Sequence, residues 1–465
     1  MNRKNKAIYP ISDISTCFSA HIRLSVATGW SVFQLEVMWR LLLFLPVWGA
    51  EGKCYWNEKC PYKLFGTKTP YDVVRGDIRD IPALEKCEAV SVWMMIRHGT
   101  RRPEKEELDK MKAVVGLATE VVRAHREGRG DMCEQDIENL EKWSWNEELD
   151  ASPSELTATG TDEMQGIGQR FGQNFENVLE NLQQYQIRAS IELRTQQSAN
   201  AFADGLMRQN QTLNISSSLN HDLTARPYRH CNKRFYDVLV GPKIPQETDK
   251  YLQSHEFQKV QTSIQKRTGL EESLSPKTIL LIYDVCRYHR SISPRQTDAW
   301  CSLFSDNDLK ILEYVEDLQH YYRNGHGDPI NSKLGASSLM DLYEKFELGT
   351  QGVTSFSAYF SHDTMMGMLY AALGLYVDRP ALSGRERNKK RRWRTSFLTP
   401  FAANFVAVLN KCNDPSGSVY KVRFFVNEKE VHLCSHRACS WKDFHGKFNK
   451  FTQNLDFCNE TLVTS

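Results

Sequence analysis

The sequence predicts an α/β protein in which a mostly helical domain is inserted into a sheet domain. Strand-like apolar runs occur early, at 89–96 and 187–193, and return late, from 356 to 433, whereas the stretch between them carries mainly helical patterns. Strands that alternate with helices on both sides of a helical block indicate one sheet with an insertion. The predicted units are 1–50 as a leader, 51–206 and 351–465 as the two parts of the α/β core, and 207–350 as the inserted helical domain.

Strands and helices alternate in the first part of the core. The apolar run 89–96 stops at Arg97-His98-Gly99, which is typical of a buried strand that ends in a loop. Residues 164–182 place apolar side chains at helical spacing and predict a helix. The run 187–193 predicts a second strand that ends at Arg194, and a helix follows through residue 206.

The remaining elements follow in the same way. Within 207–350, apolar residues at 309, 312, 315 and 318 have helical spacing, and strand signals are few. Strand character returns at 356–360, 404–409, 420–426 and 430–433. The turn residues Asn413, Pro415 and Gly417 separate the second and third of these strands.

The overall charge excludes one class of partner. The chain has 59 basic and 57 acidic side chains, for a net charge of +2. This near balance argues against a nucleic-acid binder that works by bulk charge, so a polyanion must meet a local cluster of bases. The sequence leaves the oligomeric state open.

A secretory leader is predicted near the amino terminus. Met38-Trp39-Arg40 supplies a short basic start, 41–47 an apolar stretch, and Gly49 or Ala50 a small residue for cleavage. The apolar run 41–50 is about half as long as a membrane-spanning helix requires, so no transmembrane helix is expected. The 37 residues before Met38 fit a leader poorly, and translation starting at Met38 is the alternative to Met1.

Cysteines and glycosylation sequons agree with a secretory route. Of twelve cysteines, Cys17 would leave with the leader, and the odd remainder predicts at least one unpaired thiol. The short steps Cys54/Cys60 and Cys434/Cys439 suit small disulfide loops. Acceptor sequons occur at Asn210, Asn214 and Asn459. We therefore expect a secreted or lumenal protein, with export, a vesicle and the endoplasmic reticulum all left open.

The most informative motif is Arg97-His98-Gly99-Thr100-Arg101-Arg102-Pro103, directly after the first strand. Ligands of open α/β sheets gather at the carboxyl ends of strands, so a site is expected here. Several adjacent cations suit a hydrophobic core poorly because each needs a partner. Guanidinium groups bind phosphoryl oxygens in pairs, and they keep a neighbouring imidazole neutral and therefore nucleophilic.

Arg-His-Gly-x-Arg-x-Pro resembles the signature of the histidine phosphatases, in the branch that contains acid phosphatases and phytases. Two later segments extend the resemblance. Residues 188–206 resemble the strand and helix that carry a second arginine, which would be Arg194, and His362-Asp363 resembles the late His-Asp pair. Some members carry His-Ala-Glu instead, so the aspartate form leaves the position of bond cleavage open. The resemblance implies a phosphoglycerate-mutase-like sheet domain with an inserted helical domain.

The resemblance also implies the roles of these residues. His98 is expected to be the nucleophile and Asp363 the proton donor, and four side chains are expected to bind phosphate: Arg97, Arg101, Arg194 and His362. No metal and no cofactor are expected, because the arginines supply the positive charge that a magnesium ion brings elsewhere. The implied activity is hydrolysis of phosphomonoesters, on inositol polyphosphates such as phytate and its lower forms or on 2,3-bisphosphoglycerate.

Further cations are candidates for binding a polyphosphorylated small molecule. Residues 385–394 contain seven bases, among which we select Lys390, Arg391 and Arg392, and Lys68 precedes the first strand. A solvated loop is the alternative for such a run. Two other functions stay open: a broad-specificity acid phosphatase of the same branch, and a catalytically inactive relative that binds polyanions.

Overall fold

The protein is described by a computed structural model that covers residues 54–55, 62–206, 213–217, 222–296, 298–415, 417–451 and 454–459. The predicted leader 1–50 and the sequon at Asn210 lie outside these residues. A single sheet runs through the described part, in the order β3-β2-β4-β1-β5-β6-β7, with β8 paired to β6. The strands are β1 (Cys87–Arg97), β2 (Gln184–Ala189), β3 (Ile215–Ser217), β4 (Ser355–Ser361), β5 (Asn404–Asp414), β6 (Gly417–Val426), β7 (Lys429–Val431) and β8 (Cys439–Ser440).

Parallel pairing brings three strand ends to one edge of the sheet. β4 lies between β2 and β1 and is parallel to both, with Arg97 opposite Ser361 and Ala189 opposite Phe360. β5 is antiparallel to β1 and begins the antiparallel half. The carboxyl ends of β1, β2 and β4 therefore meet at the same edge, although they lie far apart in the sequence.

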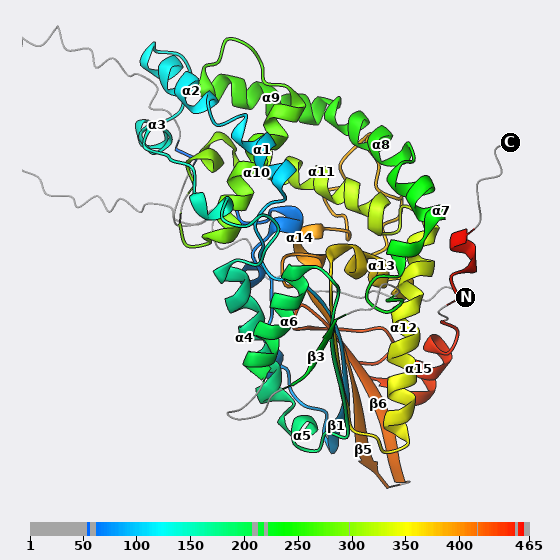
Figure 1. The fold of residues 1–465 in the computed structure, drawn as a ribbon. Helices are drawn as coiled ribbons and strands as arrows, with labels where there is room; N and C mark the ends of the chain where they lie inside the picture. The colour runs from blue at the N-terminus through cyan, green and yellow to red at the C-terminus, as the bar shows by residue number, and fades with distance from the viewer. Residues whose placement is uncertain are drawn as a thin grey trace, which may run out of the picture.

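Helices cover both faces of the sheet (Figure 1). On one side lie α4 (Ala158–Asn174), α5 (Glu176–Glu180) and α6 (Leu193–Leu206), and on the other α12 (Pro329–Thr350), α13 (Asp363–Leu373) and α15 (Trp441–Phe448). Alternate residues of β1 join different hydrophobic clusters, Met94 on the α4 and α6 side and Trp93 on the α12 side. Burial on both faces explains why β1 reads as a continuous apolar run. The predicted helix 164–182 is divided into α4 and α5 at Phe175.

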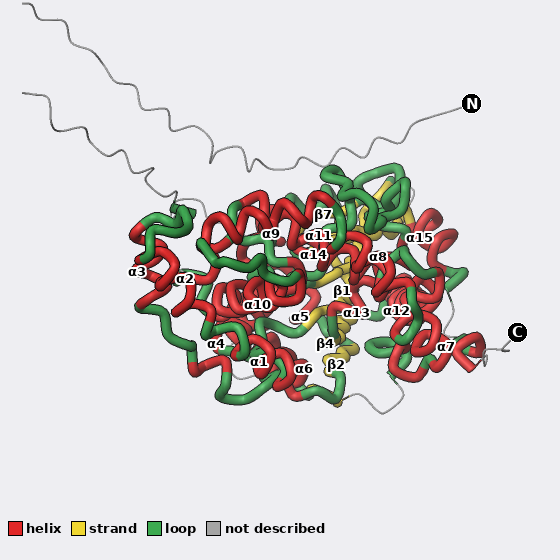
Figure 2. Tube along the Cα trace, turned by 90° about the horizontal axis from the view of Figure 1, so that it is seen from above, coloured by secondary structure: helices red, strands yellow, loops and turns green. Residues whose placement is uncertain are grey.

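A helical block stands over the carboxyl edge of the strands, as Figures 1 and 2 show from two directions. It contains α1 (Lys105–Lys112), α2 (Leu117–Arg126), α3 (Glu134–Glu141), α7 (Asn232–Arg234), α8 (Lys243–Leu252), α9 (His255–Thr268), α10 (Pro276–Ile292) and α11 (Asp306–Asn324). The predicted α/β fold with a helical insertion is therefore confirmed.

The predicted boundaries of that insertion, 207–350, need correction. α1 packs on α10 and α2 on α9, so 105–141, which the sequence assigned to the core, contribute to the block. Conversely, β3 pairs with β2, and α12 packs against β1 and β5 of the sheet. Helical periodicity reports which face of a helix is buried, but not which layer buries it.

Disulfides connect segments that are distant in the sequence. The bonds are Cys54–Cys133, Cys87–Cys412, Cys231–Cys458, Cys286–Cys301 and Cys434–Cys439. The predicted Cys434/Cys439 loop is confirmed, whereas the Cys54/Cys60 loop is wrong because Cys54 bonds to Cys133. All ten cysteines in the described residues are paired, and Cys17 and Cys60 lie outside them.

Candidate active site

His98 lies directly after β1 at the carboxyl edge of the sheet, and its side chain is buried. Its backbone N–H donates to Ser361 at the end of β4, and its carbonyl accepts from Ala402 before β5. The ring Nδ1 lies 2.9 Å from the Gly99 carbonyl oxygen. A carbonyl oxygen can only accept, so Nδ1 carries the proton and the lone pair is on Nε2.

The loop that follows His98 is held against the amino-terminal part of α4 by hydrogen bonds and close backbone packing. The Thr100 N–H donates to Glu163 over 2.8 Å, and the Thr157 N–H donates to the Thr100 carbonyl over 2.9 Å. Gly99 and Gly160 pack backbone against backbone, where neither has space for a Cβ. Burial raises the pKa of Glu163 to about 7, although hydrogen bonds from Thr100 and Tyr71 oppose that effect. Sequence patterns gave no signal for Glu163.

Three guanidinium groups act on the His98 imidazole, those of Arg97, Arg101 and Arg194. Arg97 is buried, donates to the carbonyls of Thr67 (2.5 Å) and Thr399 (2.8 Å), and lies over the Phe401 ring. Arg101, in the loop after β1, lies 3.2 Å from Glu107. Arg194, in α6, lies 3.6 Å from Glu104. Both carboxylates lie at the start of α1.

The charge around His98 keeps its imidazole neutral. Burial, followed by the positive charges of Arg97, Arg194, His362 and Arg101, lowers the pKa of His98 well below its usual value. Without a proton on Nε2, that nitrogen keeps its lone pair at acidic as well as neutral pH. The site can therefore offer a nucleophile beside a concentrated positive charge.

Arg194 reaches the site from a helix and not from a strand end, so the predicted strand 187–193 needs correction. β2 ends at Ala189, and Arg194 lies in the first turn of α6. Thr195 stabilises this turn, because its hydroxyl proton is shared between the carbonyl oxygens of Ser190 at 2.9 Å and Glu192 at 2.6 Å. Such local hydrogen bonds compete with strand pairing.

His362 follows β4 and faces His98, with 5.5 Å between the ring centroids. Its Nε2 lies 3.1 Å from Glu192 and 3.3 Å from the Ser190 hydroxyl, and Glu192 also pairs with Arg226 over 2.8 Å. Glu192 thus occupies the Nε2 side of His362, the side chain that the family resemblance assigns to phosphate binding. Neither Glu192 nor Arg226 was predicted, although Glu192 is only two residues before Arg194.

Asp363 begins α13, directly after His362, and 21% of its side chain is exposed. Burial raises its pKa, but the positive charge of Arg97, followed by the interactions with His320 and Lys68, outweighs burial, and the net pKa is lowered. The carboxyl group is therefore ionised in the ligand-free protein. His320, which no motif indicated, approaches it from α11 to 3.3 Å.

Lys68 lies beside the same cluster. It ends the short helix η2 (Gly66–Lys68), is buried, and donates to the Thr67 hydroxyl over 3.3 Å. Burial is the largest cause of its lowered pKa, followed by the charge of Arg287. The charge of Lys68 also acts on Asp363, which places this lysine at the margin of the site.

Much of the basic run 385–394 is committed to carboxylates of the helical block. Arg391 is buried and lies 2.5 Å from Asp317 and 3.6 Å from Glu313, both on α11. Arg387 and Arg394 pair in the same way with Glu256 and Glu313. Lys390 and Arg392 are exposed. Of the three residues selected from this run, Arg391 is therefore committed to an ion pair, whereas Lys390 and Arg392 stay candidates for substrate contact.

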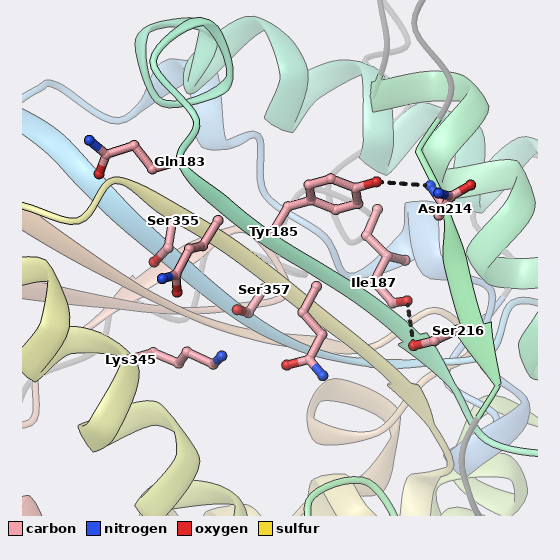
Figure 3. Close-up of a pocket in the computed structure, with 10 residues that line it drawn as sticks. Gln183, Tyr185, Ile187, Asn214, Ser216, Lys345, Ser355 and Ser357 are labelled. Carbon is pink, nitrogen blue, oxygen red and sulfur yellow. Dashed lines mark hydrogen bonds between the residues drawn. The ribbon is translucent and has the colours of Figure 1, made fainter.

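A separate pocket of about 650 Å³ lies at the opposite, amino-terminal end of β2 and β4 (Figure 3). Its lining is mostly neutral: Gln183, Gln184, Tyr185, Gln186, Ile187, Asn214, Ser216, Lys345, Ser355 and Ser357. The Asn214 sequon lies at this pocket, where its backbone N–H donates to the Tyr185 hydroxyl, and both Asn214 and Asn459 are exposed. With one lysine and no arginine, this pocket lacks the charge that the His98 cluster offers to a phosphate.

Metal-ligand chemistry is not evident in the described residues. One group of potential ligands gathers there, Cys54, Cys133 and Asp136. Its two cysteines are joined in a disulfide, which removes the thiolates that a metal would need.

The fold and the clustered motifs define the class of protein, and the chain belongs to the histidine phosphatase superfamily (branch 2), whose family model matches residues 90–427. The predicted family is confirmed. Over 426 residues the chain is 31% identical to multiple inositol polyphosphate phosphatase 1 of Drosophila melanogaster, covering 88% of this chain and 90% of that protein.

Two solved structures share the fold. The phytase from D. castellii is 15% identical and superposes with a TM-score of 0.68, covering 83% of this chain and 84% of the phytase. The multiple inositol polyphosphate phosphatase of Bifidobacterium longum, in complex with inositol hexasulfate, is also 15% identical and gives a TM-score of 0.62. That comparison covers 80% of this chain and 93% of the other.

Proposed function

We propose that this protein hydrolyses phosphomonoesters of inositol polyphosphates, phytate and its lower forms, through a phosphohistidine intermediate. One observation carries the proposal: the neutral imidazole of His98, with its lone pair on Nε2, is buried among three guanidinium groups and a second histidine. The names of the similar proteins support inositol polyphosphates as the substrate class.

The first step transfers a phosphoryl group to His98. Nε2 attacks phosphorus, and the bond to the ester oxygen breaks with its electron pair on that oxygen. The equatorial oxygens are held by four side chains: Arg97, Arg101, Arg194 and His362. Their positive charge is already in place before charge develops, so little reorganisation is needed. Asp363 in its acid form gives the leaving oxygen a proton, because an alkoxide is a poor leaving group.

The second step releases phosphate. Asp363, now a carboxylate, takes a proton from a water molecule as that water attacks phosphorus. The bond between phosphorus and Nε2 breaks, its electron pair returns to His98, and inorganic phosphate leaves. Both steps use only side chains and water.

Lys68, Lys390 and Arg392 are the proposed contacts for the other phosphates of the substrate. Lys68 is close enough for its charge to act on Asp363, and the other two are exposed on a basic loop. A ring that carries several phosphates needs cations beyond those that hold the reacting group. 2,3-Bisphosphoglycerate, with two phosphates, would use fewer of them.

The test of the nucleophile is His98→Ala, which we expect to abolish phosphate release from inositol hexakisphosphate. His326→Ala is the matched control, because the Nε2 of His326 contacts a backbone carbonyl beside α13 and not the site. The unsubstituted protein should yield a trapped phosphohistidine that is labile to acid and stable to base. Substantial turnover by His98→Ala would overturn the assignment.

The test of the proton donor is Asp363→Asn, assayed on an inositol phosphate and on p-nitrophenyl phosphate. We expect a loss of about 100-fold or more on the inositol ester and a much smaller loss on the nitrophenyl ester, whose leaving group needs little protonation. Equal losses on both substrates would contradict the role of Asp363.

An acid phosphatase of broad specificity is the second candidate activity. It has the same His98 chemistry but predicts similar kcat/KM values for phytate, 2,3-bisphosphoglycerate and p-nitrophenyl phosphate. We expect phytate to be preferred, and identification of the product isomers will show which phosphate leaves first. An inactive polyanion-binding relative predicts no trapped phosphohistidine at all.

A secreted or lumenal location is also proposed. Five disulfides in the described residues favour an oxidising compartment. Among the helices of the described ranges, none is long and apolar enough to cross a membrane. Glycosylation of the exposed Asn214 and Asn459, detected as a mass loss after endoglycosidase treatment of the natural protein, would support this route.

A further inference from the structure

The helical block contributes a histidine to the site that no sequence motif indicated. His320 on α11 points its Nδ1 at Asp363 Oδ2, at a distance of 3.3 Å. Only 13% of the His320 side chain is exposed, so solvent screens this contact weakly. The contact joins the helical block to the residue that we propose as proton donor.

Hydrogen bonds around His320 define which of its nitrogens carries a proton. The Asn324 amide nitrogen lies 3.1 Å from His320 Nδ1, while the amide oxygen accepts from Arg234 over 3.1 Å. Arginine can only donate, so the amide oxygen faces Arg234 and the amide N–H₂ faces His320. In neutral His320, Nδ1 is therefore an acceptor, and its proton is on Nε2, toward Glu316 at 3.8 Å.

We propose that His320 is a positioning residue for the proton donor: its Nδ1 holds the Asp363 carboxyl group and shares with it the proton that the leaving alcohol takes. This inference rests on the proposed function, in which Asp363 is the general acid. The single lone pair on Nδ1, which also faces the Asn324 N–H₂, repels a carboxylate but can accept a shared hydrogen bond from a carboxylic acid. The geometry thus favours the protonated form of Asp363, which is the form that catalysis needs.

The charges that face this pair oppose protonation in the ligand-free protein. Arg97, Lys68 and His362 face Asp363, whereas Glu316, Arg323 and Lys68 face His320. Burial lowers the pKa of His320 to about 4, against the opposing charges of Asp363 and Glu316. At about pH 5 the pair therefore lacks its proton before substrate binds.

Substrate changes that balance. A phosphate dianion held by Arg97 offsets the positive charge that keeps Asp363 ionised. His320 and Asp363 then take up one proton from solvent, and this proton lies between His320 Nδ1 and Asp363 Oδ2. When the phosphorus–oxygen bond breaks, the leaving oxygen takes this proton from Oδ2. In the second step Oδ2 takes a proton from the attacking water, and the hydrogen bond to His320 forms again.

The test is His320→Gln, which keeps a polar side chain but cannot share a proton. We expect kcat for an inositol phosphate to fall about tenfold and kcat for p-nitrophenyl phosphate to change less than about twofold. The amide N–H₂ of the new side chain stabilises the carboxylate form of Asp363, so the alkaline limb of the inositol phosphate profile should move to lower pH. Unchanged p-nitrophenyl phosphate hydrolysis also reports that the variant is folded.

His326→Gln is the matched control, since His326 follows α11 and contacts the Leu375 carbonyl outside the site. It should leave both rates and the pH profile unchanged. The double variant of His320→Gln with Asp363→Asn should be no slower than Asp363→Asn alone, because His320 acts through Asp363.

The outcomes separate this inference from the proposed function. Equal losses on both substrates for His320→Gln, no loss on either, or additive losses in the double variant would overturn the role of His320. If Asp363→Asn itself loses both activities equally, the assignment of the proton donor fails instead. A selective loss for Asp363→Asn without one for His320→Gln leaves the proposed function standing and removes only the positioning role.

Discussion

The contact between Gly160 and the loop after His98 allows a distant substitution to test the site. Gly160 lies in the first turn of α4, where an alanine Cβ would lie 2.8 Å from the Thr100 nitrogen and 2.7 Å from Leu156 Cδ1, and closer still to the Thr100 oxygen. Real Cβ atoms essentially never approach a neighbour to less than 3.0 Å. Gly160→Ala must therefore push the loop and the helix apart.

The size of the displacement sets the expected loss. The Thr100 backbone must retreat by about 1 Å, and Thr100 is only two residues from His98, so the shift reaches the imidazole. Displacement of a reacting group by about 1 Å costs roughly 100-fold in rate. Alanine is the better helix former by about 1 kcal/mol, which partly offsets the strain in the folded state. We expect kcat to fall roughly 100-fold with a small change in thermal midpoint.

The assay compares Gly160→Ala with Gly166→Ala in the same helix. A Cβ at Gly166 would meet only the Arg170 guanidinium, at 3.0 Å from Nη1, and no backbone atom. The control should keep its kcat on p-nitrophenyl phosphate and gain slightly in thermal midpoint. If Gly160→Ala retains kcat within about threefold of the unsubstituted protein, the close approach does not position His98, and the reasoning fails.

Three further predictions concern charge. Glu192→Gln removes the carboxylate that lies 3.1 Å from His362, so inorganic phosphate should inhibit the enzyme about tenfold more strongly. An unchanged inhibition constant would contradict competition between Glu192 and phosphate. Arg391→Met removes the ion-pair partner of the buried Asp317 and should lower the free energy of unfolding, measured with urea, by about 3–5 kcal/mol. A loss below about 1 kcal/mol would show that this ion pair is dispensable. The pKa of His98 is lowered, so its neutral form persists as pH falls. We therefore expect no decline in kcat/KM for p-nitrophenyl phosphate between pH 7 and pH 5. A decline centred near pH 6.5 would mean that the pKa of His98 is not shifted.

Local sequence was sufficient for the residues at and directly after the end of β1. The run 89–96 predicted β1, and the motif after it placed Arg97, His98 and Arg101 together because they are adjacent in the chain. Arg194 and His362 were found only through the family resemblance. Periodicity alone could not bring them to His98, since strand order is a property of the whole sheet.

Other residues of the site carry no local signal. His320 lies on a long amphipathic helix, Glu163 lies within another, and Glu192 resembles any acidic residue near a turn. The basic run 385–394 gave a strong local signal but did not show which of its residues are free to bind substrate. Its bases look alike in sequence, yet Arg391 is buried against Asp317 while its neighbour Arg392 is exposed.

The sequence by itself determined the class of chemistry, because a histidine beside two arginines at the end of a buried strand needs only neighbouring residues to be recognised. The tertiary structure decided which carboxylates and which second histidine meet that imidazole. Parallel pairing of β1, β4 and β2 brings their carboxyl ends together, the helical block adds His320, and the short helix η2 adds Lys68. Charges interact through space over a few ångströms, so pKa values and proton transfer depend on this packing and not on separation along the chain.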